Sequence, residues 1–200
     1  MPSLIKYLHA KFIFARRVKI LAGLLSELTP AGASVLDIGC GDGSVGYLIG
    51  QKKNAPVQGL EIAARPNCLI KYKIFDGQHI PLESRSIDIC LFTDVLHHTL
   101  MVEELLNEAC RVSRQYLLIK DHLFKNKLDF NILKLMDWIG NRPYGVNLIY
   151  NYHSKEKWLK YFSASKLKVI IWNDKIPLYP FPFNFLFGKN LHFIALLKKI

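Results

Sequence analysis

One segment of this 200-residue chain has residue types and spacing that suit a bound cofactor. Residues 35–43 read VLDIGCGDG, in which three glycines alternate with other residues after an acidic one. Glycine lacks a Cβ, so it allows a sharp turn and a close approach of the backbone to a ligand. The apolar residues 34–38 predict a buried strand, and residues 45–49 begin a helix. This order of strand, glycine turn and helix predicts a nucleotide-type site.

The spacing of the glycines separates two classes of cofactor. Nicotinamide and flavin sites use G-x-G-x-x-G, which would place a third glycine at position 44, where this chain has Ser44. The segment instead resembles motif I of the class I S-adenosylmethionine-dependent methyltransferases. It is most similar to their type 11 branch, which includes quinone-biosynthesis methyltransferases. The resemblance extends to about residue 121 and implies that S-adenosylmethionine is the cofactor.

The resemblance also implies which residues bind the cofactor. Glu61, at the end of the second predicted strand, matches the acid that accepts hydrogen bonds from both ribose hydroxyls, although it could simply cap a strand. Asp76 matches the acid that contacts the adenine amino group in relatives, although an Asp-Gly pair is also typical of a turn. The predicted cofactor-binding residues are Asp37, Gly39, Cys40, Gly41, Gly43, Glu61, Asp76, Gly77, Thr93 and Asp94.

The fourth predicted strand is expected to end beside the transferred methyl group. Residues 86–98 resemble this strand and the loop after it, and residues 92–94 are expected next to the sulfonium. The positive charge of a sulfonium favours carbonyls, aromatic faces or a carboxylate nearby. Asp88, at the start of the strand, is expected to have a structural role.

Histidines supply the candidates for a catalytic base. Methyl transfer is an in-line displacement, so a base is needed only when the acceptor must lose a proton. Ligands bind at the carboxyl ends of parallel strands, where His122 is the first candidate base and His98 the second. The alternative for His97 and His98 is that they pack beneath the cofactor. No metal-binding residues are predicted.

Two later segments have compositions that suggest contact with an acceptor or a partner. Residues 137–153 are polar and aromatic and are predicted to form a substrate lid within an insertion at 122–165, the alternative being an ordinary surface loop. Residues 177–187 are unusually aromatic for a connection. They are predicted to meet a hydrophobic acceptor, a membrane surface as a peripheral contact, or a second copy of the chain.

Composition narrows the class of protein. With half of its residues hydrophobic, the chain is predicted to form a single domain at 1–200, beginning with a helical segment at 1–30. Four widely spaced cysteines fit neither a zinc site nor a disulfide scaffold and indicate reduced thiols. No apolar run is long enough to span a bilayer, so a cytoplasmic location is expected.

The net charge of +11 is concentrated in residues 111–200, which hold sixteen Lys or Arg residues against five acids. The lysines are scattered singly, which is typical of a solvated surface and makes nucleic acid an unlikely partner. The predicted function is therefore methyl transfer to a small acceptor, for which a hydrophobic molecule is one hypothesis. The alternatives are a non-catalytic cofactor-binding or regulatory protein and a nucleic-acid methyltransferase. Against the last, no Asn-Pro-Pro-Tyr type motif follows the fourth strand.

These residues require an α/β fold to bring them together. Short apolar runs predict strands at 34–38, 57–61, 71–75, 87–92, 115–120, 168–172 and 192–197. Helical periodicity predicts helices at 12–28, from 45 onward, and at 102–112, 128–139 and 155–163. The expected fold is a Rossmann-like, doubly wound, mostly parallel seven-stranded sheet. Because no clear helix separates the last two strands, an antiparallel edge strand is expected.

Overall fold

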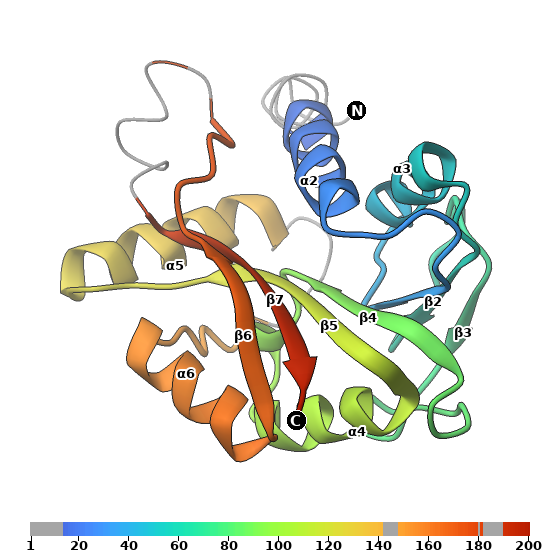
Figure 1. Ribbon diagram of the computed structural model, residues 1–200. Coiled ribbons are helices and arrows are strands. Elements are labelled where there is room, and N and C mark those ends of the chain that lie inside the picture. The colour runs from blue at the N-terminus through green and yellow to red at the C-terminus, as the bar shows by residue number, and fades with distance from the viewer. Residues whose placement is uncertain (1–13, 142–147, 180, 182–189) are drawn as a thin grey trace.

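The computed structural model describes residues 14–141, 148–179, 181 and 190–200, and its centre is a single seven-stranded sheet (Figure 1). The strand order is β3-β2-β1-β4-β5-β7-β6. The strands are β1 (Val35–Ile38), β2 (Val57–Glu61), β3 (Tyr72–Ile74), β4 (Ile87–Thr93), β5 (Ser113–His122), β6 (Leu167–Asn173) and β7 (His192–Lys199).

Helices cover both faces of this sheet (Figure 1). On one face, α2 (Ala15–Glu27) and α3 (Ser44–Lys53) enclose a core that includes Leu25 and Ile49. On the other face, α4 (Val102–Val112) and α6 (Lys155–Ala164) enclose a core that includes Leu106 and Trp158. A third helix, α5 (Lys127–Asn141), follows the end of β5 and lies at the rim of the molecule. Among the described residues, no helix is both long and apolar enough to cross a bilayer.

The direction of the strands confirms the predicted fold class. β3, β2, β1, β4 and β5 are parallel, whereas β7 runs antiparallel to both β5 and β6. The reversed strand is thus β7, one position in from the edge strand β6. Because the chain leaves β1 for β2 on one side and reaches β4 on the other, the order of the sheet reverses between β1 and β4. Open α/β sheets bind their ligands beyond the carboxyl ends of the strands at this point.

Three local predictions differ from the structure. β5 begins at Ser113 directly after α4, so no separate turn joins them, because Ser113 already has an extended backbone. β5 also continues to His122, since its last residues pair with the start of β7. Finally, α5 runs to Asn141, so the first residues of the predicted lid at 137–153 are helical. Residues 142–147 of this lid and residues 1–13 of the N-terminal segment lie outside the described part of the chain.

Asp88 joins the starts of β1 and β4, in agreement with its expected structural role. Its Oδ2 accepts hydrogen bonds from the Ser34 backbone N–H (2.8 Å) and hydroxyl (2.7 Å), and its Oδ1 pairs with Arg114 at 2.7 Å. The Ser34 hydrogen bonds and the Arg114 charge lower the pKa of Asp88 to about 2.

We predict that Asp88→Ala lowers the free energy of unfolding by about 1–3 kcal/mol, because hydrogen bonds to a charged group are lost. Since the folded-state pKa is depressed, this contribution is present above the unfolded pKa of about 3.9 and is lost as the pH falls toward 2. Urea unfolding at pH 7 and pH 3 measures it. Glu83→Ala, which removes an exposed carboxylate from the segment just before β4, is the control. Equal stability of the two variants would contradict the assigned role.

Candidate functional site

The three glycines of the turn at residues 39–43, here called the glycine turn, have left-handed backbone conformations for different reasons. Gly39, Gly41 and Gly43 have φ values of +71°, +59° and +74°. A Cβ at Gly39 would lie 2.6 Å from Val95 Cγ2, and one at Gly43 would lie 2.9 Å from Ile70 Cγ1. A Cβ at Gly41 would meet nothing within 4 Å. Gly39 and Gly43 therefore allow close packing, whereas Gly41 presents bare backbone to open space.

The carboxylate of Glu61 lies directly against this turn. The Gly41 backbone N–H donates to Glu61 Oε1 at 2.7 Å, and the Ile62 N–H donates to Oε2 at 3.1 Å. Arg65 pairs with the same carboxylate at 3.5 Å. The end of β2 thus places a buried acid at the tip of the turn, where a ligand diol or amine would meet it.

Asp37 and Cys40, both predicted to bind cofactor, are buried beneath the turn. Burial raises the pKa of Asp37 to about 7, and the negative charges of Glu61 and Asp42 add to this effect. Asp37 Oδ1 is buried and has no hydrogen-bond partner in the described structure. The Cys40 side chain packs on β2, since a Cβ at Gly59 would lie 2.5 Å from its Sγ. The unsatisfied oxygen of Asp37 fits a bound group that donates hydrogen bonds.

Asp76 and Gly77 form an exposed turn near the end of β3. Asp76 Oδ1 accepts from the backbone N–H groups of Gln78 (2.8 Å) and His79 (2.7 Å), and Oδ2 lies 2.8 Å from His79 Nδ1. These contacts lower the pKa of Asp76 to about 2, and the hydrogen bond with the His79 side chain has the largest effect. The structure therefore gives Asp76 the role of a turn residue, and its contact with adenine stays a prediction.

Asp94 follows β4 and is held between two cations. Its carboxylate forms ion pairs with Arg17 of α2 and with the buried Lys120 of β5. Burial would raise the pKa of Asp94, but these two positive charges hold it well below the ordinary value. Burial lowers the pKa of Lys120 to about 8, opposed by Asp94. Thr93, the last residue of β4, has a buried hydroxyl without a hydrogen-bond partner in the described structure.

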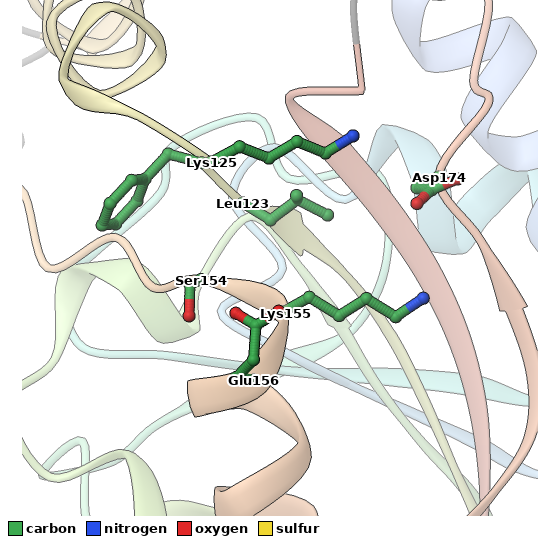
Figure 2. Close-up of a pocket in the computed structure, with 7 residues that line it drawn as sticks. Leu123, Lys125, Ser154, Lys155, Glu156 and Asp174 are labelled. Carbon is green, nitrogen blue, oxygen red and sulfur yellow. The ribbon is translucent and has the colours of Figure 1, made fainter.

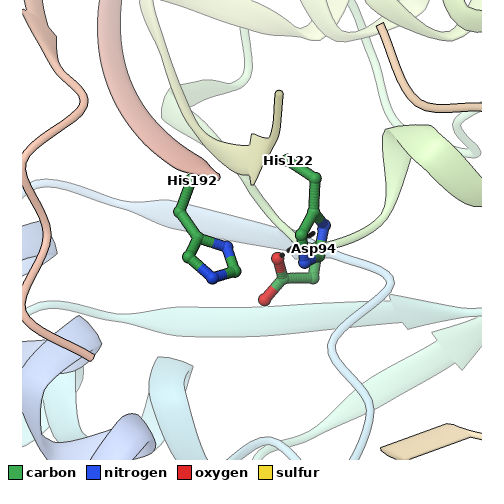
Figure 3. A group of neighbouring side chains, drawn as sticks. All are labelled: Asp94, His122 and His192. Atoms are coloured by element: carbon green, nitrogen blue, oxygen red, sulfur yellow. Dashed lines mark ion pairs between the residues drawn. The ribbon is translucent and has the colours of Figure 1, made fainter. Parts of the chain in front are cut away.

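Two histidines join Asp94 from neighbouring strands. His122 and His192 are paired across β5 and β7, and their ring centroids lie 4.8 Å apart (Figure 3). His122 Nδ1 lies 3.5 Å from Asp94 Oδ1, and His192 Nδ1 lies 3.3 Å from Lys120 Nζ. Burial, followed by the Lys120 and His97 charges, lowers the pKa of His122 to about 4. His122 is therefore neutral at pH 7 and is able to accept a proton.

The donor atoms of Asp94, His122 and His192 lie within 4.8 Å of one another, a spacing that could hold a metal ion. However, the Lys120 ammonium already contacts Asp94 and His192. A divalent ion would have to displace this cation and would also face Arg17. The charges of the group thus favour an internal ion pair over a metal site.

His97 is positively charged at pH 7, whereas His122 is neutral. Its Nδ1 lies 2.6 Å from Asp121 Oδ1, and its Nε2 lies 3.6 Å from Asp137 Oδ2 on α5. Burial alone would lower the pKa of His97, but the two carboxylates raise it to about 10. The Tyr152 hydroxyl donates to Asp137 at 2.5 Å. A buried imidazolium therefore connects the end of β5 with α5 and the segment around Tyr152.

His98, the second predicted base, lies beside His97 with ring centroids 4.0 Å apart. Burial and the His97 charge lower the pKa of His98, so it is neutral at pH 7. Its Nδ1 is buried without a hydrogen-bond partner in the described structure. His98 lies in the short 3-10 helix η2 (Leu96–His98), whereas His122 contacts the Asp94 carboxylate. The assignment of either histidine as a base stays a prediction.

Several residues of this site carry no prediction from the sequence. These are Arg17, Lys120, Asp121 and His192. For Lys120 the signal was a charged side chain in the otherwise apolar strand β5. Asp137 and Tyr152 lie within the predicted lid, but their contacts with each other and with His97 were not predicted.

The predicted aromatic connection at 177–187 is described only in part. Leu178 is fully buried in the core beneath α2, and Tyr179 packs against the same core. Phe181 is exposed. Residues 180 and 182–187 lie outside the described residues, so the predicted contact of this connection with acceptor, membrane or partner stays a prediction.

A cavity of about 210 Å³ lies beyond the end of β5 (Figure 2). It is lined by residues 123–125, residues 154–156 and Asp174. None of these residues belongs to the glycine turn or to the ion pairs around Asp94. The cavity is therefore separate from the predicted cofactor cradle.

Comparison with known proteins agrees with the geometry of the glycine turn. A family described as methyltransferase domain matches residues 10–173. No curated protein sequence is significantly similar to the chain.

Several solved structures share the fold. A putative methyltransferase from Haloferax volcanii, in complex with the Trm112 methyltransferase activator, has a TM-score of 0.73 at 11% identity, covering 96% of this chain and 94% of that one. Geranyl diphosphate C-methyltransferase from Streptomyces coelicolor, solved with S-adenosyl-L-homocysteine, has a TM-score of 0.67 at 11% identity, covering 90% and 75%. The [4+2]-cyclase SpnF has a TM-score of 0.66 at 12% identity, covering 90% and 80%. At these identities the likeness shows the fold.

We predict that the charged His97 makes folding stability depend on pH above neutrality. Because its folded-state pKa is raised to about 10, the contribution is fully present below the unfolded pKa of about 6.5 and is lost as the pH rises through 10. The free energy of unfolding should fall by up to about 1.4 kcal/mol per pH unit between pH 6.5 and 8. Above pH 8 the buried Lys120, whose pKa is lowered to about 8, contributes a slope of the opposite sign.

Urea unfolding between pH 6.5 and pH 8 measures this slope before Lys120 titrates. His97→Gln should flatten it, whereas His153→Gln should keep it, because burial lowers the pKa of His153 and moves its titration away from the interval. If His97→Gln keeps the wild-type slope, the imidazolium assignment is wrong.

Proposed function

Because the chain belongs to the methyltransferase domain family, we propose that it binds S-adenosylmethionine and transfers the methyl group to a small, apolar acceptor. The contact of Glu61 with the Gly41 N–H carries this proposal. It sets an acidic acceptor beside bare backbone at the carboxyl ends of β1 and β2, where an open parallel sheet binds its ligand. Solved structures of the same fold hold S-adenosylhomocysteine or sinefungin, which supports this cofactor.

In this proposal the glycine turn and the acids around it bind different parts of the cofactor. Glu61 accepts hydrogen bonds from the ribose hydroxyls, and the Gly41 backbone lies against the ligand without a side chain between them. The unsatisfied Oδ1 of Asp37 accepts from a donor of the amino-acid part. Asp76 and Gly77 lie beside the adenine part of the cofactor in this proposal, since Gly77 packs against Ile62, the neighbour of Glu61.

The proposed reaction uses the residues around Asp94. The bound cofactor supplies an electrophilic methyl group. His122, neutral at pH 7, accepts the proton of the acceptor oxygen or carbon, and the charged His97 lies behind it with its Nδ1 3.3 Å away. Arg17 and Lys120 stabilise the negative charge that develops on the acceptor when it loses this proton.

Aromatic side chains next to the histidines support an apolar acceptor. Tyr152 lies with its ring centroid 5.5 Å from His97 and 5.8 Å from His122. It belongs to a small apolar cluster with Leu133 and Phe130 of α5. The geranyl diphosphate C-methyltransferase, which shares the fold, is a methyltransferase for a small molecule.

One observation favours a second candidate function, binding of the cofactor without methyl transfer. Arg17 and Lys120 already neutralise Asp94, so this carboxylate offers little attraction to a sulfonium. A [4+2]-cyclase shares the fold, so the fold does not by itself require methyl transfer. The complex of another such structure with Trm112 adds the hypothesis of a protein activator for this chain.

We predict that Glu61→Ala weakens binding of S-adenosylmethionine by about 10- to 100-fold, because hydrogen bonds to a charged group contribute about 1.5–3 kcal/mol. Isothermal titration calorimetry measures the affinity. Glu104→Ala, which removes an exposed acid on α4, should bind like the wild type. Circular dichroism checks that both variants are folded. Equal affinity in the Glu61 variant would remove the basis of the proposed cofactor site.

We predict that His122→Asn lowers turnover by about 10²- to 10⁴-fold and leaves cofactor affinity unchanged, because only the proton acceptor is lost. Metabolite extracts incubated with methyl-deuterated S-adenosylmethionine would reveal the acceptor by its labelled product in mass spectrometry. Glu104→Ala, at the exposed acid on α4, is again the control. Unchanged product formation in the His122 variant would rule out this residue as the base. Absence of any product from the wild type, with cofactor binding intact, would favour the second candidate function.

A further inference from the structure

The outer face of α5 carries an exposed apolar stripe made of Leu128, Leu135 and Ile139. These side chains are 68%, 48% and 42% exposed. Their spacing of seven and four residues places them on one side of a helix with 3.6 residues per turn. Contiguous exposed apolar side chains on one helix are typical of an interaction surface.

The opposite side of the same helix is already buried against the protein. Leu133 packs with Tyr152, and Asp137 pairs with His97. The core therefore does not need the stripe, because α5 is anchored through its inner side. The apolar character of the outer side calls for a separate explanation.

The charges on α5 indicate the kind of partner. Lys127 and Lys134 are exposed, and Lys134 lies over the Tyr150 ring at 5.0 Å. Asp129 is partly buried and accepts from the Lys125 N–H at 3.0 Å, and Asp137 faces the interior. The exposed charges on the described part of this helix are thus all positive.

We propose that α5 docks on the surface of an anionic lipid bilayer. Leu128, Leu135 and Ile139 enter the boundary between headgroups and acyl chains, while Lys127 and Lys134 meet the lipid phosphates. Trp138, 47% exposed beside the stripe, lies at the depth where indole rings prefer the interface. The excess of Lys and Arg in residues 111–200 favours an extended anionic surface in the same way.

This docking has a consequence for the candidate site. The inner side of α5 contacts His97 through Asp137 and packs with Tyr152, so the bilayer would lie on the far side of the helix from the proposed acceptor site. The proposed docking does not depend on methyl transfer, and vesicle binding tests it independently of the proposed function.

The test is sedimentation of the full chain with vesicles of phosphatidylcholine containing phosphatidylglycerol, compared with phosphatidylcholine alone. We expect binding to the anionic vesicles, weakened about tenfold or more by the pair Leu128→Ser and Leu135→Ser. The matched control is Leu69→Ser with Ile74→Ser, which removes two exposed apolar side chains near the opposite sheet edge. Lys127→Gln with Lys134→Gln should lower binding to anionic vesicles only.

Tryptophan fluorescence gives a second, site-specific readout. Trp158 is fully buried and Trp172 is stacked on Phe193, so lipids with brominated acyl chains should quench mainly Trp138. Trp138→Phe should abolish this quenching. Circular dichroism establishes that each variant is folded.

Three results would overturn the proposal. One is vesicle binding that the α5 pair and the control pair weaken equally. Another is the absence of quenching in the wild type. The third is a wild-type protein that binds no vesicles and forms a dimer in sedimentation equilibrium. If the Leu128 and Leu135 substitutions dissociate this dimer, the stripe serves self-association.

Discussion

A lysine ammonium removed from water needs a partner of opposite charge, and the buried Lys120 has this partner in Asp94. The pair connects β5 to the loop after β4, and Arg17 brings α2 to the same carboxylate. Removing one member of such a pair leaves an uncompensated buried charge, at a typical cost of about 3–5 kcal/mol. These ion pairs therefore fix the positions of α2 and of the ends of β4 and β5 relative to one another.

The same constraint sets the charge states of the histidines. Burial, and after it the positive charge of Lys120, lowers the pKa values of His122 and His192. The carboxylates of Asp121 and Asp137 instead raise the pKa of His97, which lies in η2. A neutral and a charged imidazole therefore lie 3.3 Å apart, because different charged groups contact each of them.

The glycine turn and this charged group are neighbours through Val95. A side chain at Gly39 would collide with Val95, the residue after Asp94, so the absence of a Cβ lets the loop after β4 pack against the turn. The elements predicted to hold the cofactor and those predicted to act on the acceptor consequently meet at one edge of the sheet. The apolar cluster around Tyr152 then extends the site toward α5.

The sequence by itself determined the fold and the glycine turn, because short apolar strands, helical periodicity and glycine spacing are local signals. It also placed Glu61 and His122 at strand ends, where parallel strands bring their residues together. The partners of Asp94 and His97 were decided only by the tertiary structure. Arg17, Lys120 and Asp137 come from distant segments, and pairing depends on the register of β5 with β7 and on the docking of α2 and α5. Charge states depend on which charged groups meet in the buried site, and no local pattern specifies this.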